Sequence, residues 1–590
     1  MELNKEQQDA VECSGDVVVS ACPGSGKTRV LTARVIRGVS ELQSVQERVA
    51  ALTFTNRAAD EIQVRLDREG VPTDYLWAGT IHAFALEWIL RPYAPYSETL
   101  RLGFSVEDEY FCNRLLREIR KQCGLDTYAE INTKYNRVGS VDNSNEATDA
   151  AFKLYNRELR HHKVIDYDEV LYLAYHLLAD NPEIAANLGA IFRLFCVDEV
   201  QDIQDLQYGI LSEIYRASPI HPQMFFVGDA DQSIFESIGG LSKSPQEIAE
   251  EFGMLNLKYF ELVGNYRSTQ RIIDCYRLFR PNVAKIESRV NNPKEHGHIS
   301  FENQTIHRDD LFKRIAELVR LALDSGVPEK EICIVAPQWE HVRALARQLV
   351  ENLPDVSFDA PGLSPLYIVR ESVWYNLARL FLTEPVPAQI RSRFRCANEL
   401  LLDLGLLIGS EIPEKISSAR RILRLVNQLQ SNETDGIPFL RNLFTQFLNR
   451  CGLSLSGHTE LSDSFNVFFE KAESQLADSQ TGRLTRVESY KKIFSYPSGV
   501  VVNTCHGVKG EEFDTVIAFG LLRGYVPHWS VILKGTTDEA SQRESKLLYV
   551  VASRAKRQLH LIAESGRQSK KGNPYQTSSL LDKIEFDYDE

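Results

Sequence analysis

A short run of β-branched residues, Val17 to Ser20, is followed by the segment Ala21-Cys22-Pro23-Gly24-Ser25-Gly26-Lys27-Thr28. The apolar residues that come next recur at helical spacing, from Val30 to Ile36. A buried strand, a glycine-containing loop ending in Lys-Thr, and a helix together predict a P-loop. The flanking strand and helix disfavour the alternative, an accidental Gly-Lys-Thr loop. The feature therefore predicts an α/β fold with a phosphate site where the strand ends.

The loop residues have separate expected tasks. Lys27 is expected to reach the β- and γ-phosphates, and Thr28 to bind Mg²⁺. Ala21 stands where the strict motif has glycine. The nucleotide-binding residues predicted in this stretch are Pro23, Gly24, Ser25, Gly26, Lys27, Thr28 and Arg29.

A second apolar run, Phe192 to Val197, ends in the acidic pair Asp198-Glu199. At the end of a strand in a P-loop fold, Asp198 would bind the metal, and Glu199 would orient and deprotonate the attacking water. An Asp-Glu pair taken alone is more often a solvated turn, because these residues prefer the surface. The P-loop upstream favours the catalytic interpretation.

A third apolar run, Met224 to Val227, leads into a polar segment that contains Gln232. Ligands of open α/β sheets bind at the carboxyl ends of the strands, so this segment is expected at the same edge as the other two sites. From there Gln232 could sense the γ-phosphate.

Composition limits the function only weakly. The hydrophobic and charged fractions, 43% and 25%, are ordinary for globular protein, and 590 residues predict about three or four compact units. The net charge of −14 neither supports nor excludes nucleic acid, because a local basic and aromatic groove can bind DNA on an acidic body.

The ten cysteines include no Cys-x-x-Cys pair. Structural zinc or an iron–sulfur cluster is therefore not expected, and reduced thiols in the bacterial cytosol are the simplest interpretation. No apolar run is long enough to cross a bilayer, and the polar stretch Met1 to Asp9 does not have the composition of a secretory signal. We expect no membrane partner.

Taken in order along nearly the whole chain, several further segments resemble the motifs of the UvrD/PcrA/Rep group of superfamily 1 helicases. A single motif is weak support, but the full set in the family's order is strong. The segments are Leu3 to Gln7, Ala51 to Ala59, Gly79 to Phe84, Asn265 to Thr269, Thr504 to Phe513 and Leu548 to Ala555.

The resemblance implies roles at an ATP site shared by two lobes. Gln7 would read the adenine edge, Tyr266 would stack on adenine, and Glu512 would contact ATP. Arg267 and Arg554 would act as arginine fingers, although a solvated surface arginine is the alternative for each. The predicted catalytic residues are Lys27, Glu199, Gln232, Arg267 and Arg554.

The same resemblance implies a path for single-stranded DNA, where aromatic side chains can stack on bases of any sequence. Phe54 and Phe84 could equally be core residues. The predicted DNA-binding residues are Thr53, Phe54, Thr55, Asn56, His82, Phe84, Phe235, Thr504 and His506.

The chain also departs from the family's pattern. Ser237 and Ile238 stand where the family usually has a tryptophan that stacks on DNA and an arginine that links DNA to the nucleotide. This departure puts strong unwinding and tight coupling in question more than it does hydrolysis. Cys22 for glycine and Ser553 for threonine look tolerable.

The motif spacing predicts an α/β fold with two RecA-like P-loop domains, each with a parallel sheet and a mainly helical insertion. The second insertion looks short for the family. The predicted ranges are 1–85 and 191–280 for the first lobe, 86–190 for its insertion, 281–370 and 491–590 for the second lobe, and 371–490 for its insertion.

The resemblance implies an ATP- and Mg²⁺-dependent enzyme that moves 3′→5′ on single-stranded DNA or on a 3′-tailed duplex. A repair protein or a nuclease is a possible partner. One alternative is a DNA-sensing ATPase subunit of a Gabija-type anti-phage complex, which would activate a nuclease and unwind weakly or not at all. A non-catalytic DNA-binding scaffold is another, and the intact ATP motifs disfavour it.

Overall fold

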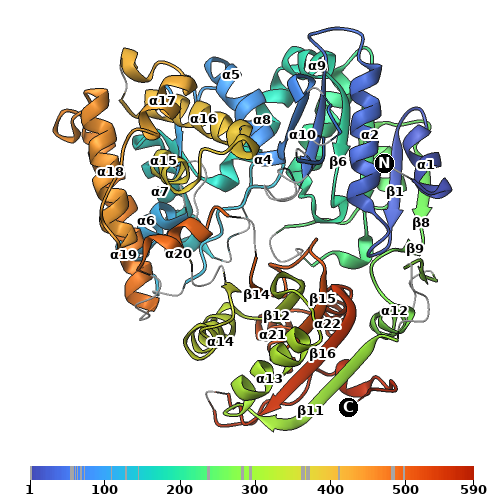
Figure 1. The fold of residues 1–590 in the computed structure, drawn as a ribbon. Coiled ribbons are helices and arrows are strands. Elements are labelled where there is room, and N and C mark those ends of the chain that lie inside the picture. Colours follow the sequence, from blue (N-terminus) through green and yellow to red (C-terminus); the bar gives the residue numbers. More distant parts are fainter. Residues whose placement is uncertain are drawn as a thin grey trace.

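The computed structural model describes the chain except residues 1–2, 54–58, 60–61, 63, 67–68, 72, 108, 127–128, 142, 144, 235–238, 281–284, 291–295, 361–363, 365, 367–371, 409–411, 480–484, 496–497, 570 and 590. It contains two six-stranded sheets in which every pairing of neighbouring strands is parallel (Figure 1). The predicted fold class, two parallel α/β lobes with mainly helical insertions, is confirmed.

The first sheet has the strand order β3-β2-β6-β7-β1-β8. Three neighbouring strands, β6, β7 and β1, lead into the three predicted parts of the phosphate site, so their carboxyl ends meet at one edge. The strands are β1 (Val17–Ala21), β2 (Arg48–Thr53), β3 (Leu76–Thr80), β6 (Phe192–Val197), β7 (Gln223–Gly228) and β8 (Lys258–Leu262).

The second sheet has the order β11-β16-β15-β12-β14-β13. Its central strands, β12 and β15, are buried along their whole length, as parallel strands covered on both faces should be. The strands are β11 (His298–His307), β12 (Ile332–Ala336), β13 (Phe358–Asp359), β14 (Val500–Thr504), β15 (Phe513–Ala518) and β16 (Ala555–Ser565).

Helices cover both sheets. In the first lobe α8 (Tyr167–Asp180) and α9 (Pro182–Ile191) share one apolar core with the strands. All of α8 and all but the last residue of α9 lie in the range 86–190 predicted for the insertion. Because they pack into the core of the lobe, we propose a boundary nearer residue 166. The other covering helices are α2 (Lys27–Glu41), α10 (Asp205–Ala217), α12 (Gln270–Arg277), α13 (Leu311–Asp324), α14 (Trp339–Asn352) and α22 (Thr537–Ala552).

Each insertion has an apolar cluster of its own. In the first, α6 (Glu109–Gln122) packs on α7 (Glu146–His161). The second insertion lies beside the first in Figure 1, and an ion pair of 3.2 Å joins Arg91 to Asp403. Its helices are α15 (Val373–Leu382), α16 (Ile390–Ile408), α17 (Ala419–Val426), α18 (Gly436–Cys451), α19 (Thr459–Ser479) and α20 (Val487–Lys492).

Among the residues that the structure describes, none of the helices combines the length and the apolar composition that a membrane span requires.

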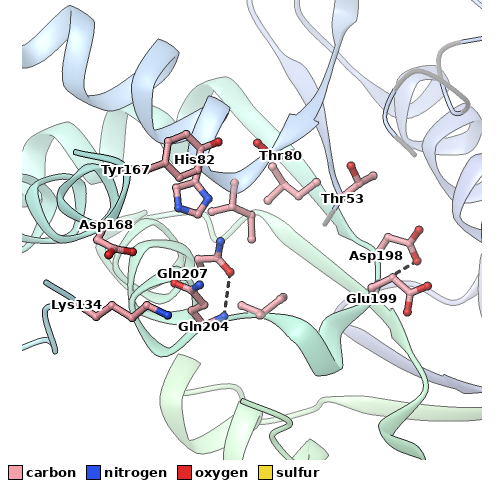
Figure 2. A pocket seen from close by; sticks show the side chains of 13 residues that line it. Thr53, Thr80, His82, Lys134, Tyr167, Asp168, Asp198, Glu199, Gln204 and Gln207 are labelled. Atoms are coloured by element: carbon pink, nitrogen blue, oxygen red, sulfur yellow. Dashed lines mark hydrogen bonds between the residues drawn. The ribbon is translucent and has the colours of Figure 1, made fainter. Parts of the chain in front are cut away.

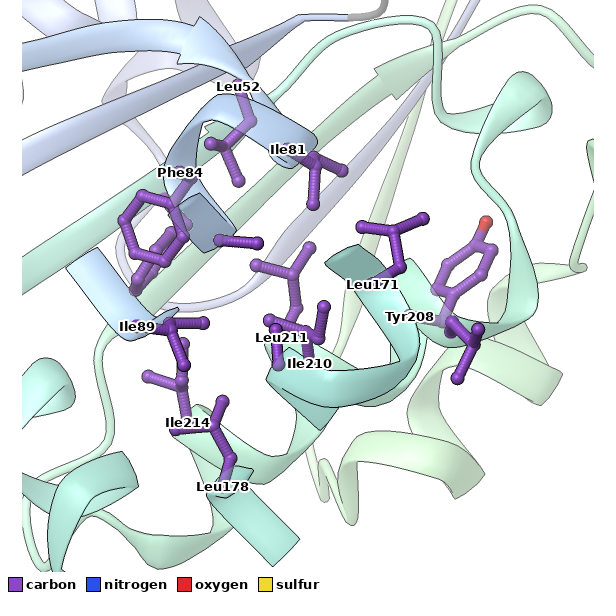
Figure 3. Packing of buried hydrophobic residues seen from close by; sticks show 14 of the residues in the cluster. Leu52, Ile81, Phe84, Ile89, Leu171, Leu178, Tyr208, Ile210, Leu211 and Ile214 are labelled. Carbon is purple, nitrogen blue, oxygen red and sulfur yellow. The ribbon is translucent and has the colours of Figure 1, made fainter. Parts of the chain in front are cut away.

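Phe84 belongs to the first lobe's core (Figure 3). Its side chain is fully buried, and its ring packs edge-on against Trp77, Phe192 and Phe195 with centroid distances of 5.3, 5.2 and 5.8 Å. Of the two interpretations of Phe84, this burial favours the core residue over the DNA contact, because the ring is enclosed by the sheet and its helices.

We predict that Phe84→Ala lowers the free energy of unfolding by about 3–5 kcal/mol, because it leaves a cavity that the rigid surroundings cannot close. Denaturant unfolding followed by circular dichroism measures the change. Tyr96→Ala, which shortens an aromatic residue that is 68% exposed, should stay within about 0.5 kcal/mol of the parental protein. Equal effects of the two substitutions would contradict the core position of Phe84.

Candidate nucleotide and DNA site

The loop between β1 and α2 has the backbone shape that a phosphate cradle needs. Gly24 and Gly26 have φ angles of +70° and +84°, in the left-handed region that favours glycine. A Cβ atom on Gly24 would come within 2.6 Å of Arg267 Cβ and 2.9 Å of Asn265 Oδ1. The loop is therefore packed directly against the segment that carries the first predicted arginine finger.

Lys27 begins α2 with its ammonium group aimed into the site. Lys27 Nζ is buried and lies 3.8 Å from Asp229 Oδ2, but it has no hydrogen-bond partner among the described residues. A buried ammonium without a hydrogen bond is costly unless an anion completes its surroundings. The hydroxyl of Ser25 is buried in the same way. Both groups fit the oxygens of a bound phosphate.

Asp198 and Glu199 follow β6 at the adjacent position of the sheet edge. Glu199 has a φ of +49°, and its backbone N–H donates to Asp198 Oδ1 at 3.0 Å. Burial raises the pKa of Glu199, but the positive charges of Lys27 and Lys509 outweigh burial and lower that pKa to about 2. Glu199 is therefore ionised at neutral pH, as a proton acceptor must be.

The end of β7 joins the two lobes. The Gln232 amide donates to Asp229 Oδ2 at 2.7 Å, and Arg554 Nη2 donates to Gln232 Oε1 at 2.7 Å. Arg554 belongs to the second lobe, and only 1% of it is exposed. Burial and the nearby Arg267 lower the pKa of Arg554 to about 9, so it keeps its charge at neutral pH.

Arg267 lies between the P-loop and the second lobe. Its Nε donates to Glu512 Oε2 at 2.8 Å, and its Nη1 donates to the Ser553 carbonyl at 2.8 Å. The next residue back, Tyr266, donates its backbone N–H to the Gly24 carbonyl at 2.8 Å. The structure thus brings both arginines to the cleft that contains Lys27.

The predicted adenine-binding residues lie beside the loop. Asn4 and Gln7 form the capping box that starts α1 (Lys5–Glu12), and the Gln7 amide donates to the Ser25 carbonyl at 2.8 Å. Asn4 Nδ2 donates to the Tyr266 hydroxyl at 2.5 Å. Gln7 is therefore held against the phosphate loop, with Tyr266 attached to the same helix start.

A pocket of about 450 Å³ extends from the carboxylates of Asp198 and Glu199 toward the first insertion (Figure 2). His82 stacks on Tyr167 within its wall, with a ring-centroid distance of 4.4 Å and an interplanar angle of 21°. Burial lowers the pKa of His82 to about 4, so the ring is neutral. The polar and aromatic lining residues are Thr53, Thr80, His82, Lys134, Tyr167, Asp168, Asp198, Glu199, Gln204 and Gln207.

Sequence reasoning had not singled out five of these residues. Tyr167 and Asp168 begin α8, Gln204 and Gln207 begin α10, and Lys134 comes from the first insertion. Tyr167 and Asp168 could have been found from the sequence, because an aromatic residue and a carboxylate come shortly after the strand residues Val164 and Ile165. Lys134 is far from Gln204 and Gln207 in sequence and meets them only in the folded chain.

Two family models match this chain. The "UvrD/REP helicase N-terminal domain" model matches residues 3–252, and the "UvrD-like helicase C-terminal domain" model matches residues 410–566. The chain belongs to the UvrD/Rep helicase family.

Named relatives of this helicase family agree with the models. The "ATP-dependent DNA helicase PcrA" of Leuconostoc citreum is 25% identical, over 95% of this chain and 81% of its own length. The "Putative ATP-dependent DNA helicase YjcD" of Bacillus subtilis is 22% identical, over 97% of this chain and 80% of its own length. The "ATP-dependent DNA helicase UvrD1" of Mycobacterium bovis is 30% identical, over 59% of this chain and 48% of its own length.

The remaining motif residues of this helicase fall into two groups. Thr504 is the last residue of β14, and His506 follows the strand. Thr504 is 5% exposed, and its hydroxyl accepts a hydrogen bond of 3.0 Å from the Gly507 N–H. Burial and Lys509 lower the pKa of His506. The residues outside the described part of the chain are Phe54, Thr55, Asn56, Phe235, Ser237 and Ile238.

We predict that Gly24→Ala lowers kcat/KM for ATP by on the order of tenfold, because the added methyl group displaces Arg267 and Asn265 from the loop. Gly124→Ala is the matched control, since Gly124 has a similar φ of +65° but nothing within 4 Å of an added Cβ. It should cost only backbone strain of about 1–2 kcal/mol. Steady-state kinetics decide the comparison, and equal losses for both variants would contradict the packing argument.

Proposed function

We propose that this chain is a DNA-dependent ATPase that moves 3′→5′ along single-stranded DNA and unwinds a 3′-tailed duplex. The chain of contacts from Arg554 through Gln232 to Asp229 and Lys27 carries the proposal, because it connects the second lobe with the phosphate loop. Cations delivered by a second lobe complete an ATP site only when the lobes are together, which couples hydrolysis to lobe movement.

The chemistry follows from the residues at the edge of the first sheet. Thr28 and Asp198 would hold Mg²⁺, which supplies positive charge to the phosphates when bound. Lys27 would bind the β- and γ-phosphates, and Glu199 would accept a proton from the attacking water. Arg267 and Arg554 would stabilise the charge that develops as the γ-phosphate leaves.

The DNA part of the proposal is supported by the pocket beside His82. It places neutral aromatic surface and side-chain amides next to Asp198 and Glu199. A base held against His82 and Tyr167 would thus lie in the same pocket as the hydrolytic carboxylates. Stacking on aromatic rings tolerates every base, which suits a motor that moves along any sequence.

We predict that Glu199→Gln binds ATP but lowers kcat by at least about 100-fold, because the amide cannot accept the water's proton. DNA-stimulated phosphate release and equilibrium nucleotide binding measure the two effects. Glu183→Gln, an identical change on the exposed start of α9, is the control. Hydrolysis by Glu199→Gln at the parental rate would show that another group activates the water.

Lys27→Ala should abolish turnover by removing a phosphate contact.

Polarity is tested with tailed duplexes. We expect unwinding of a substrate with a 3′ single-stranded tail, and no unwinding of one with a 5′ tail or with blunt ends. The Glu199→Gln protein is the control for ATP dependence. Unwinding from the 5′ tail would contradict the proposed direction, and a parental protein whose ATPase does not respond to single-stranded DNA would contradict the proposed motor.

A second candidate keeps the ATPase and changes the task. Ser237 and Ile238 stand where a DNA-stacking tryptophan and a coupling arginine are usual in the family, and the second insertion looks short. These departures favour a DNA-sensing ATPase subunit that activates a partner nuclease in anti-phage defence. DNA-stimulated ATPase without unwinding, together with a co-purifying nuclease, would support this candidate over the helicase.

A further inference from the structure

One second-lobe cation lies deep inside the first lobe. Lys509 follows β14, and its ammonium group donates hydrogen bonds to the Asp202 carboxylate and, at 2.5 Å, to the Gln232 carbonyl. The side chains of Lys509 and Asp202 are only 6% and 0% exposed. Surface ion pairs contribute little, but this pair has lost almost all contact with water.

Asp202 belongs to the same turn as the proposed catalytic base. The turn Val200–Asp202 directly follows Glu199, and the Asp202 N–H donates to the Glu199 carbonyl at 2.9 Å. The second carboxylate oxygen, Oδ1, is buried without a hydrogen-bond partner among the described residues. Lys509 is therefore the principal group that offsets the buried charge of Asp202.

Gln232 belongs to the other turn that Lys509 contacts. Its backbone carbonyl accepts from Lys509, while its side chain joins Asp229 to Arg554. One ammonium group thus holds two neighbouring turns of the first lobe, which carry the proposed base and the proposed γ-phosphate sensor. A shift of Lys509 would displace both turns together.

The segment that carries Lys509 is a tightly packed, hydrogen-bonded turn, and it also carries the predicted DNA contact His506. The Lys509 N–H donates to the His506 carbonyl at 3.2 Å, and the Gly507 N–H donates to the Thr504 hydroxyl at 3.0 Å. A Cβ atom on Gly507 would lie 2.3 Å from Asn503 Oδ1, so the turn is tightly packed. His506 and Lys509 must therefore move as one unit.

We infer that Lys509 and Asp202 form a positioning pair that couples DNA engagement at His506 to the placement of Glu199 and Gln232. This inference rests on the proposed function, since it concerns the DNA stimulation of ATP hydrolysis. A buried charge that loses its partner is strongly unfavourable, so the pair holds the lobes in register when they meet. DNA that fixes the Thr504–His506 segment fixes the pair as well.

The test compares Lys509→Met, Asp202→Asn and the double variant with the parental protein, by ATPase kinetics with and without single-stranded oligo(dT). Each single change should lower the DNA-stimulated kcat by about 10- to 100-fold through misplacement of the catalytic turns. Because the pair acts as a unit, the double variant should lose no more than the worse single variant. Lys509→Arg should restore part of the stimulated rate.

Two readouts separate positioning from other roles. Nucleotide affinity should stay within about twofold in Asp202→Asn, because this residue contacts no phosphate in the proposal. Amide hydrogen exchange at residues 229–233 should accelerate in both single variants. Lys153→Met, the same change at an exposed ion pair with Asp149, is the control. If Lys509→Met does not fold, the isosteric variant Asp202→Asn still tests whether the pair positions the catalytic turns.

Losses that multiply in the double variant, or a DNA-stimulated kcat of Asp202→Asn within about twofold of the parental value, would overturn the pair as a coupling device. A different result, a parental protein whose ATPase rate does not change with DNA, would contradict the proposed function and, with it, this inference. The two results that concern the variants leave the DNA stimulation of the parental protein intact. Failure of this inference can therefore be distinguished from failure of the proposed function.

Discussion

Buried negative charge at one edge of the first sheet is the constraint on which the rest of the structure depends. The carboxylates of Asp198, Glu199, Asp202 and Asp229 follow two neighbouring strands and lie in a region of low water access. Such a cluster is unfavourable unless cations approach it. One cation, Lys27, comes from the P-loop of the same lobe.

The other cations come from the hinge and from the second lobe, as Arg267, Lys509 and Arg554. Apposition of the lobes therefore has an electrostatic cause that exists before any nucleotide arrives. A triphosphate bound there would add negative charge and so increase the electrostatic attraction for these cations. In the proposed mechanism, nucleotide binding and lobe closure would both follow from this charge balance.

The first-lobe part of the proposed ATP site was predictable because Lys27, Glu199 and Gln232 each come shortly after a strand. Runs such as Val17 to Ser20 and Phe192 to Val197 are recognisable as buried parallel strands, and their carboxyl ends must meet at one edge. Side chains whose role depends on packing could not be assigned in this way. Phe84 belongs to a motif that contains predicted DNA contacts, yet it faces the core.

Long-range pairings were also outside the reach of the sequence. Nothing in the composition around Lys509 shows that it contacts a carboxylate 307 positions away, because that contact requires two lobes to be oriented. The wall of the pocket beside His82 has the same origin, since His82 and Tyr167 are far apart in sequence and become neighbours only when α8 packs into the core of the first lobe. The net charge of −14 was uninformative for a related reason: the cations that matter are gathered in the cleft.

The separate apolar cluster of the second insertion has a consequence for how chains of this architecture diverge. Its buried side chains come from residues 366–490, and the two clusters beside the second sheet draw on other residues. Shortening, exchanging or re-orienting the insertion therefore leaves the sheet's own packing intact. Natural selection can therefore change this insertion to suit different binding partners while the two α/β lobes stay unchanged.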